Sequence, residues 1–469
     1  MMVVLRSRTL IYQMVLFFSI VILIIVALRT SSVQDSLSRF KTNNIDPIIT
    51  HEDKGPPHPN YKPTPSYIAP PISDPFPALA TSAPPPIPPY NIPEKDGWKK
   101  YGLSIAPPLV IGFTRSWPML LQTVVSYITA GWPPEQIYVV ENTGMQQANA
   151  RGQLTLQHPF YLNHTTLKNK LGINIIQTPV LLTFAQLQNF YFSLSYTREW
   201  PYYFWSHMDV LALGHENGFE NLTARAGEPG YKSLYTLCLE ELNRTLATDD
   251  RWGLRFFAYD HLTLQNPRAL EDINGWDTLI PYYMTDCDTY TRLTMRNWSQ
   301  IDANCGVVTD TSVALDDLLA LYRDPKVTPR FTDPNPPPPP PEDDGEIKQR
   351  RHISSKRETI DELVEYWKTL IKVADSMFHY KHGERGRNTW QAGQHGGQLG
   401  YNRSLNPCSP IFVQGEPFYY DSAGFSEAIE VLTEAGKEVY RRKWGHRDCD
   451  LIGGAGVKYE DQWKVLQDW

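Results

Sequence analysis

The pattern of hydrophobic and polar positions predicts strands that alternate with helices from about residue 104 onward. An apolar run at residues 109–114 is followed by Ser116, by a helical pattern with Pro118 in its first turn, and by Gly131 just past its end. Further strands are expected at residues 137–140, 173–176 and 202–205, and a helix at residues 184–199. This alternation is typical of an α/β protein whose mixed, mostly parallel sheet is flanked by helices in a Rossmann-like arrangement.

The second half of the chain contains longer irregular segments. We expect a strand at residues 252–258 and a helix at residues 289–298, with Asp288 at the N-cap of that helix. Residues 325–357 are rich in proline and charge, which predicts a disordered insertion. Helical patterns follow at residues 359–380 and 422–441.

An uncharged apolar stretch at residues 10–28 precedes all of these elements. At 1.5 Å per residue it spans roughly the 30 Å of a hydrocarbon core, so we expect a transmembrane helix. The alternative is a cleaved signal peptide, but the length of the run and the lack of a small-x-small cleavage site favour an uncleaved signal anchor. The predicted organisation is a cytoplasmic tail at residues 1–9, the anchor at residues 10–28, a stem at residues 29–103 and a lumenal domain at residues 104–469.

Composition favours the stem and excludes one class of partner. Fifteen of the 39 prolines lie between Pro56 and Pro93, which is typical of an extended segment. Acidic residues outnumber basic residues by 51 to 44, for a formal net charge of −7. Because no chain-wide basic field is present, we expect no nucleic-acid partner.

Two further features favour a lumenal body. A lumenal enzyme can glycosylate Asn-x-Ser/Thr sequons, and these begin at Asn163, Asn221, Asn243, Asn297 and Asn402. The five cysteines allow at most two internal disulfides, which suits an oxidising compartment. Together with the anchor, these features predict a single-pass type II membrane protein.

A candidate metal site follows the strand expected at residues 202–205. Residues two apart on an extended chain point to the same side, so His207 and Asp209 can meet one divalent cation, Mn²⁺ or Mg²⁺. The competing explanation is an aspartate that caps a turn. His395, in a glycine-rich segment, and His446 are candidates for a third ligand or a phosphate contact, although most isolated histidines do neither.

Carboxylates also mark a candidate catalytic base. Asp286 and Asp288 follow an aromatic-rich segment, and transfer of a sugar to a hydroxyl needs one carboxylate to take the acceptor proton. The competing explanation is that Asp288 caps a helix and Asp286 is a solvated loop residue.

Open α/β sheets bind ligands at strand ends. The candidates at the ends of the first two strands are Thr114, Arg115, Glu141 and Asn142.

These residues resemble GT-A-fold nucleotide-sugar glycosyltransferases of the Golgi type II membrane class, in a fungal style. The resemblance covers residues 109–298 best. It rests on the strand at residues 109–114, the strand that ends at Glu141 and Asn142, the His207 and Asp209 pair, the segment Gly275, Trp276 and Asp277, and the pair Asp286 and Asp288.

The resemblance implies a role for each candidate. In such enzymes the first two strand ends hold the nucleotide, a DxD-type motif holds a metal on the diphosphate, and a later acidic residue is the base of inverting members. Carried over, the nucleotide contacts fall on Thr114, Arg115 and Glu141, with Asn142 beside them, the metal on Asp209 with His207, and the base on Asp286 or Asp288. The chain departs from the motif where His207 replaces an acid.

The implied activity is transfer of a hexosyl or N-acetylhexosaminyl group from a nucleotide-sugar donor, with a UDP-sugar favoured. The acceptor would be a hydroxyl of a glycan, glycoprotein or glycolipid, and the reaction an inverting, metal-assisted, in-line displacement. Two alternatives stay open: a membrane-anchored glycoside hydrolase that uses two carboxylates, and a catalytically silent glycan-binding protein.

Overall fold

The computed structural model describes residues 19–20, 59, 61, 71–332, 359–382 and 422–467. The chain divides into two compact units, Met1–Thr64 and Pro65–Trp469, and every element below belongs to the second. The expected transmembrane helix at residues 10–28 lies outside the described residues, except for Ser19 and Ile20, which are helical. Within the described part of the chain, no helix is both long enough and apolar enough to cross a bilayer.

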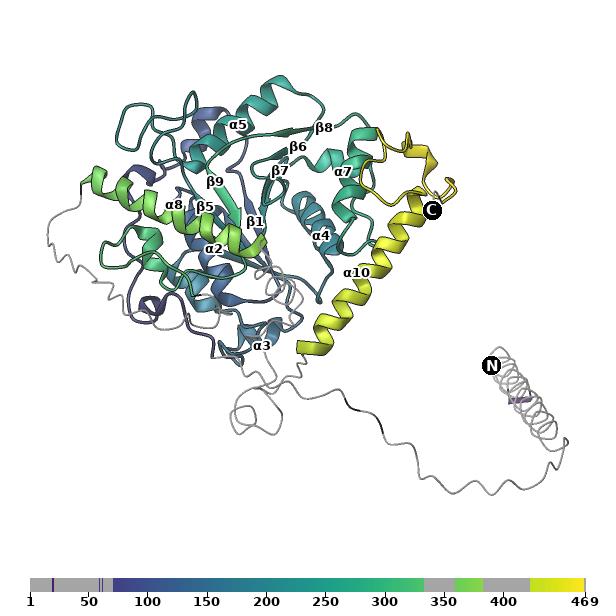
Figure 1. The fold of residues 1–469 in the computed structure, drawn as a ribbon, viewed down its shortest axis with the longest axis horizontal. Coiled ribbons are helices and arrows are strands. Elements are labelled where there is room, and N and C mark those ends of the chain that lie inside the picture. Colours follow the sequence, from purple (N-terminus) through teal and green to yellow (C-terminus); the bar gives the residue numbers. More distant parts are fainter. Residues whose placement is uncertain are drawn as a thin grey trace, which may run out of the picture. The chain divides into compact units, whose positions relative to one another are not determined.

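A seven-stranded mixed sheet forms the centre of the second unit (Figure 1). Its strands are β1 (Leu109–Phe113), β2 (Ile137–Glu141), β3 (Asn174–Gln177), β4 (Tyr203–Ser206), β6 (Trp252–Phe256), β7 (Leu262–Gln265) and β8 (Ser299–Asp302). Their order is β3-β2-β1-β4-β7-β6-β8. Only β7 runs antiparallel to its neighbours β4 and β6; the other pairs are parallel. The predicted mostly parallel α/β sheet is therefore confirmed.

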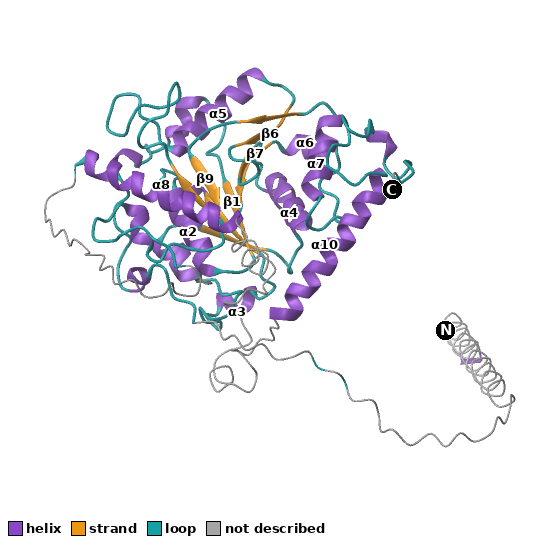
Figure 2. Cartoon of the chain, viewed as in Figure 1, coloured by secondary structure: helices purple, strands orange, loops and turns teal. Residues whose placement is uncertain are grey.

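Helices cover both faces of this sheet (Figure 2). The larger ones are α2 (Trp117–Thr129), α4 (Phe184–Thr197), α5 (Leu234–Thr248), α7 (Thr285–Met295), α8 (Ile360–His382) and α10 (Ser422–Trp444), and the shorter ones α3 (Gln146–Ala150) and α6 (Pro267–Asp272). Buried side chains of α2, α5 and α8 share one core, whereas those of α4, α6 and α7 lie in smaller cores with the sheet. A second sheet pairs β5 (Val210–Leu213) with β9 (Val307–Asp310) in antiparallel fashion, in contact with α2 and α8.

Strand β1 is buried on both faces, so its successive side chains enter different cores. Leu109 and Ile111 point into the larger core, and Val110 packs with α4 on the other side. Gly112 lies where α4 approaches closely: a Cβ at this position would overlap the Tyr191 hydroxyl. A glycine near the end of β1 thus lets α4 close against the strand.

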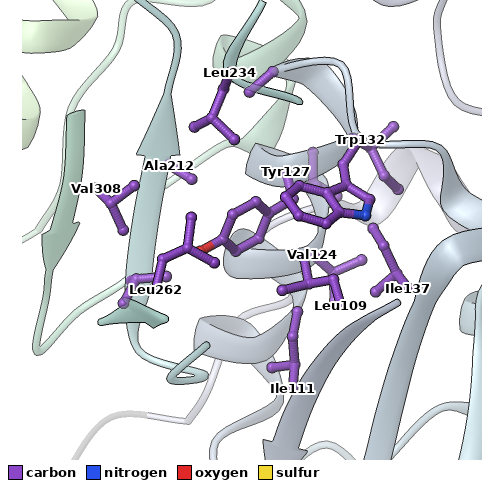
Figure 3. Close-up of a cluster of buried hydrophobic side chains, with 14 of the residues drawn as sticks. Leu109, Ile111, Val124, Tyr127, Trp132, Ile137, Ala212, Leu234, Leu262 and Val308 are labelled. Carbon is purple, nitrogen blue, oxygen red and sulfur yellow. The ribbon is translucent and has the colours of Figure 1, made fainter. Parts of the chain in front are cut away.

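Aromatic rings fill the centre of the larger core (Figure 3). Trp132 follows the helix-terminating glycine of α2 and is completely buried. Its ring contacts those of Tyr127, Phe204 and Tyr235, with centroid separations of 5.9, 5.1 and 5.2 Å. These contacts join α2, β4 and α5, and edge-to-face pairs of this kind stabilise a core beyond their area burial.

Residues 71–103 belong to the folded body, which corrects the expectation that the stem extends to residue 103. Phe76 and Leu79 are only 1% and 3% exposed and join the larger core. Proline content was misleading here because two of the prolines start short 3-10 helices, at Pro77–Ala80 and Pro89–Asn91. Proline is well suited to the first position of a helix.

A buried polar network holds this segment in place. Tyr90 Oη donates to Glu216 Oε2 over 2.6 Å, and Asn91 Nδ2 donates to Glu216 Oε1 over 3.1 Å. The Glu216 carboxylate also forms an ion pair with Arg323, and both of these side chains are completely buried. The carboxylate therefore needs these donors, because a buried charge without partners is strongly destabilising.

Two expected boundaries also change. Helix α7 begins at Thr285 rather than at residue 289, so Asp288 lies in its first turn and Met284 takes the N-cap position. The first part of the expected insertion is packed, because Tyr366 Oη donates to the Val327 carbonyl over 2.8 Å. Residues 333–357 of that insertion lie outside the described residues.

Candidate active site

The topology of the sheet places a ligand site at the carboxyl ends of β1 and β4. Strands β2 and β3 extend the sheet on one side of β1, and the chain then returns to form β4 on the other side. Open α/β sheets bind ligands in the crevice outside the strand ends at such a reversal. A cavity of about 430 Å³ lies at this point, lined by Thr114 and Arg115 after β1 and by His207 and Asp209 after β4. Its size is in the range of small-molecule and cofactor sites.

The link from β1 to α2 presents a helix N-terminus to this cavity. Ser116 adopts a left-handed conformation (φ 70°) that turns the chain into α2, and Arg115, Ser116 and Met119 all line the cavity. Asn142, also in the lining, donates to Thr114 Oγ1 over 3.3 Å. Among the described lining residues Arg115 is the only arginine or lysine. This corner therefore favours an anion.

The remaining wall is rich in aromatic side chains and includes two buried hydroxyls. Thr285 and Ser312 line the cavity at 1% and 7% exposure, and neither hydroxyl has a hydrogen-bond partner within the described part of the chain. Buried polar groups are normally paired, so these hydroxyls are suited to a ligand. The aromatic lining residues are Phe184, Tyr191, Trp205, Tyr259, Tyr282, Tyr283 and Phe425.

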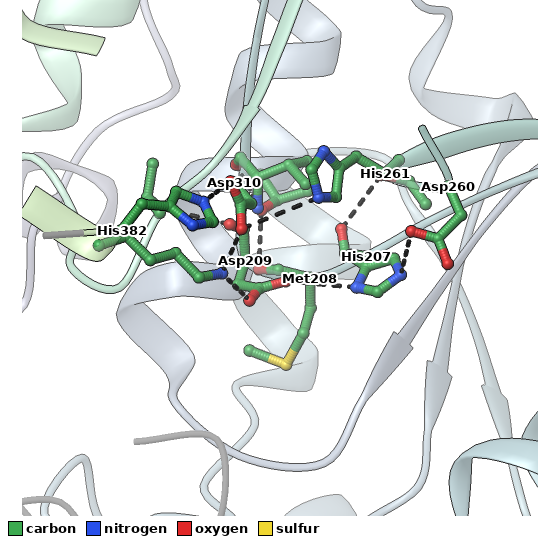
Figure 4. A network of polar contacts seen from close by, with 12 residues as sticks. His207, Met208, Asp209, Asp260, His261, Asp310 and His382 are labelled. Carbon is green, nitrogen blue, oxygen red and sulfur yellow. Dashed lines mark hydrogen bonds and ion pairs between the residues drawn. The ribbon is translucent and has the colours of Figure 1, made fainter. Parts of the chain in front are cut away.

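His207 lies between two carboxylates (Figure 4). Its Nδ1 is 3.7 Å from Asp209 Oδ1, and its Nε2 is 3.7 Å from Asp260 Oδ1. Burial raises the pKa of Asp260, although the His207 charge opposes this effect. Asp260 also lines the cavity, and it was missed as a candidate. The available signal was its place two residues after the strand expected at residues 252–258.

Asp209 forms a buried ion pair with a lysine that lies 172 residues further along the chain. Asp209 directly precedes β5 and Asp310 ends β9, which pairs with β5 in antiparallel fashion, so the two aspartates lie close together. Lys381 Nζ is 2.9 Å from Asp209 Oδ2 and 2.8 Å from Asp310 Oδ2, and its side chain is only 2% exposed. Burial acts to raise the pKa of Asp209, but the Lys381 ammonium, together with His207 and His261, outweighs burial and holds the pKa well below its usual range.

The expected Mn²⁺ or Mg²⁺ does not fit this arrangement. A divalent cation needs carboxylate oxygens that face it, and the carboxylate of Asp209 is already paired with Lys381 and His207. Within the described residues, no group of three or more His, Cys, Asp or Glu side chains could hold a metal ion. His395 lies outside the described residues.

His446 is placed away from the cavity by the length of α10. Phe425 and Ile429, near the start of this helix, line the cavity. His446 follows the end of the helix at Trp444, and Trp444 lies about 22 Å from Ile429 along the helix axis at 1.5 Å per residue. The geometry therefore does not bring His446 together with Asp209.

The two candidate bases have different environments. Asp286 lines the cavity, is half-buried, and accepts a 2.8 Å hydrogen bond from Tyr259 Oη. The Asp288 side chain is completely buried, accepts from Trp444 Nε1 over 2.9 Å, and pairs with Arg292 and Lys443 at 2.8 and 2.7 Å. Asp288 therefore joins α7 to α10, and only Asp286 can reach a substrate.

A disulfide also links the α7 region to the segment that follows α10. Cys287, between the two aspartates, is bonded to Cys449, which follows α10 and lies 162 residues further along the chain. Cys238 and Cys305 are buried and have free thiols. The junction thus has covalent and electrostatic components.

Glu141 does not reach the cavity, in contrast to its expected role. Its carboxylate is fully buried and accepts from Asn149 Nδ2 (2.7 Å) and Gln177 Nε2 (2.9 Å), with His164 Nε2 2.9 Å away. Burial acts to raise the pKa of Glu141, but these hydrogen bonds prevail and lower it. Its neighbour Asn142 faces the cavity instead, because successive residues at a strand end point to opposite sides.

The comparisons with known proteins complete these observations. No protein-family model matches the chain, and no curated protein matches it. Among solved structures, a cytidylyltransferase from Leptospira borgpetersenii serovar Hardjo-bovis aligns with a TM-score of 0.27 and 9% identity, over 42% of this chain and 75% of that chain. A mannosyltransferase from Pyrobaculum calidifontis, in complex with GDP-Man and Mn²⁺, aligns with a TM-score of 0.27 and 12% identity, over 44% of this chain and 60% of its own length. Both TM-scores are low, so neither alignment indicates a function for this chain.

Proposed function

We propose that this protein is a GT-A-like glycosyltransferase that moves a hexosyl or N-acetylhexosaminyl group from a nucleotide-sugar donor to a hydroxyl of a glycan. The observation that carries the proposal is the cavity at the reversal of strand order between β1 and β4, with Asp286 in its wall. A site at this point of an open α/β sheet suits a nucleotide. The carboxylate supplies the group that the transfer needs.

The cavity wall matches the parts of a nucleotide-sugar, with a UDP-sugar favoured from the sequence. Arg115 and the N-terminus of α2 suit the diphosphate. The aromatic side chains suit stacking on a base or a sugar ring. The Thr285 and Ser312 hydroxyls suit sugar or ribose oxygens.

The proposed chemistry is a single in-line displacement. The acceptor oxygen forms a bond to the anomeric carbon as the bond from that carbon to the phosphate oxygen breaks, and the anomeric configuration inverts. Asp286 accepts the proton of the acceptor hydroxyl, and the electron pair of the broken bond leaves on the nucleoside diphosphate. Tyr259 orients the Asp286 carboxylate through its hydrogen bond.

The proposal includes a location. The apolar stretch at residues 10–28 would anchor the chain as a single-pass type II protein of the Golgi membrane, with its body in the lumen and a glycoprotein or glycolipid as acceptor. The sequon residues Asn221, Asn243 and Asn297 are exposed. Their accessibility supports a body that meets the lumenal glycosylation machinery.

A specific observation favours a second candidate, a glycoside hydrolase. Asp260 and Asp286 line the same cavity, and burial raises the pKa of Asp260. Two carboxyl groups at one cavity, one of them with a raised pKa, are what glycoside hydrolysis uses. This candidate predicts release of reducing sugar without any nucleotide.

The test combines binding and turnover on the full chain. We expect UDP, GDP or CMP to raise the melting temperature, because a ligand that binds only the folded state stabilises it. With the matching nucleotide-sugar, Asp286→Asn should lower kcat by about 10²–10⁴-fold, the usual contribution of a general base, and leave the nucleotide Kd unchanged. Asp250→Asn, at an exposed aspartate outside the cavity lining, is the control.

Two outcomes would overturn the proposal. Sugar release that needs no nucleotide would favour the hydrolase. An Asp286→Asn variant that turns over like the Asp250→Asn control would remove Asp286 from the reaction.

A further inference from the structure

We propose that Lys381 takes the place of a divalent cation beside Asp209, and that the protein binds its nucleotide donor without a metal. The inference rests on the proposed function and specifies which groups balance the negative charges at that same site. The expected metal site placed Mn²⁺ or Mg²⁺ at Asp209 and His207, and the structure places an ammonium group there.

Every carboxylate oxygen of the Asp209 and Asp310 pair already faces a nitrogen of the protein (Figure 4). Lys381 Nζ lies between Asp209 Oδ2 and Asp310 Oδ2, at 2.9 and 2.8 Å. Asp209 Oδ1 faces His207 Nδ1 at 3.7 Å, and Asp310 Oδ1 faces His382 Nε2 at 2.9 Å. A divalent cation would have to displace these groups to gain carboxylate ligands.

Lys381 cannot easily leave. Its side chain is 2% exposed, and a buried ammonium that loses its carboxylate partners is strongly destabilising. The lysine is held by α8, whose residues Leu370, Ala374 and Met377 are completely buried in the larger core. The position of the ammonium is therefore fixed by the packing of a whole helix.

The positive charge for the donor diphosphate then comes from the opposite corner of the cavity. Arg115 lines the cavity beside the N-terminus of α2, and both features attract phosphate. Lys381 instead offsets part of the negative charge of Asp209 and Asp310, which would otherwise repel the diphosphate more strongly. In this arrangement Asp209 pairs with Lys381 rather than with a metal ion.

The wild-type chain gives the first test. We expect calorimetric titration with UDP and with GDP to give a Kd that changes by less than about twofold between EDTA and Mn²⁺ buffers. In a titration with Mn²⁺ alone, the Asp209→Asn variant should bind no less Mn²⁺ than wild type does.

Variants of Lys381 give the second test. Lys381→Met would leave two carboxylates beside His382, an oxygen and imidazole set that suits Mn²⁺. This variant should therefore gain Mn²⁺ binding that wild type lacks, detected by calorimetry or by the Mn²⁺ electron paramagnetic resonance signal. Lys381→Arg should not gain it. Lys372→Met, at an exposed position on the same helix, is the matched control.

The outcomes separate the two proposals. Nucleotide binding that weakens about tenfold or more in EDTA would overturn the metal-free site and leave the transferase standing. Failure of UDP and GDP to bind in both buffers would overturn the inference, and the proposed function would fall with it if CMP also failed to bind. The wild-type titrations decide the question even if Lys381→Met does not fold.

Discussion

The surroundings of the cavity side chains raise the pKa of some of them and lower the pKa of others. Burial raises the pKa of Asp260, whereas Lys381 holds the pKa of Asp209 well below its usual range. Burial and the His207 charge lower the pKa of His261 from 6.5 to about 4, although the two carboxylates Asp209 and Asp310 oppose them. One wall of the cavity thus combines an imidazole and an aspartate whose pKa values are lowered with an aspartate whose pKa is raised.

The His261 shift predicts how stability depends on pH. Its folded-state pKa lies below the unfolded value, so its contribution to stability is present above about pH 6.5 and is lost as the pH falls towards 4. At pH 5 the loss relative to pH 7.5 should be about 1–2 kcal/mol. Urea unfolding at both pH values measures it, and His261→Gln should show a smaller loss. Equal losses in wild type and variant would contradict the assignment.

At the scale of elements, the first turn of α4 connects local sequence to the cavity. Thr183 forms a capping box with Gln186, and the helix that begins at Phe184 supplies several lining residues. The N-cap bonds satisfy backbone donors that have no partner inside the helix. The cap therefore helps to hold one wall of the cavity.

Loss of this cap should be measurable. Thr183→Ala should lower the free energy of unfolding by about 1 kcal/mol, the usual cost of an N-cap deletion. Thr197→Ala, in the last turn of the same helix, is the control, because its hydroxyl only donates to the Ser193 carbonyl at an exposed position. Chemical denaturation of both variants gives the comparison. Similar costs for the two substitutions would argue against a role for the cap.

Elements with a strong local pattern could be predicted from the sequence, and elements that depend on distant contacts could not. Strands β1 to β4 and helices α2 and α4 were expected close to their observed bounds, because apolar runs and capping residues are local signals. Strands β5 and β9 were missed, since each pairs only with the other, across about 100 residues of sequence, and no local signal marks that pairing. Helix α5 was also missed.

The same limit applies to the site. Thr114, Arg115, Asn142, His207, Asp209 and Asp286 were expected at the site and do line one cavity. Lys381 could not be foreseen, because 172 residues separate it from Asp209 and only the packing of α8 brings them together. Asp288 and Glu141 were expected at the site but bind buried partners elsewhere, and no local pattern in the sequence reveals those partners.

At the scale of the whole molecule, the body extends further towards the N-terminus than composition suggests. Residues 71–103 supply Phe76 and Leu79 to the main core, and Tyr90 and Asn91 to the buried Glu216 carboxylate. This segment is therefore part of the cooperative fold.

Truncation tests this organisation. A chain that starts at residue 104 should be less stable than one that starts at residue 65 by about 3 kcal/mol or more, because Glu216 loses two donors and the core loses two buried side chains. Thermal melting of both chains compares them. Equal melting temperatures would mean that residues 71–103 do not contribute to the stability of the fold.

The disulfide between Cys287 and Cys449 has a consequence for the integrity of the polypeptide. A single backbone cut between residues 383 and 421 would divide the chain into two fragments, yet this bond would keep them covalently joined. Helix α10 would stay attached to α7, and with it Phe425 and Ile429 in the cavity wall. Such a nicked protein would migrate as one species on a non-reducing gel and as two after reduction.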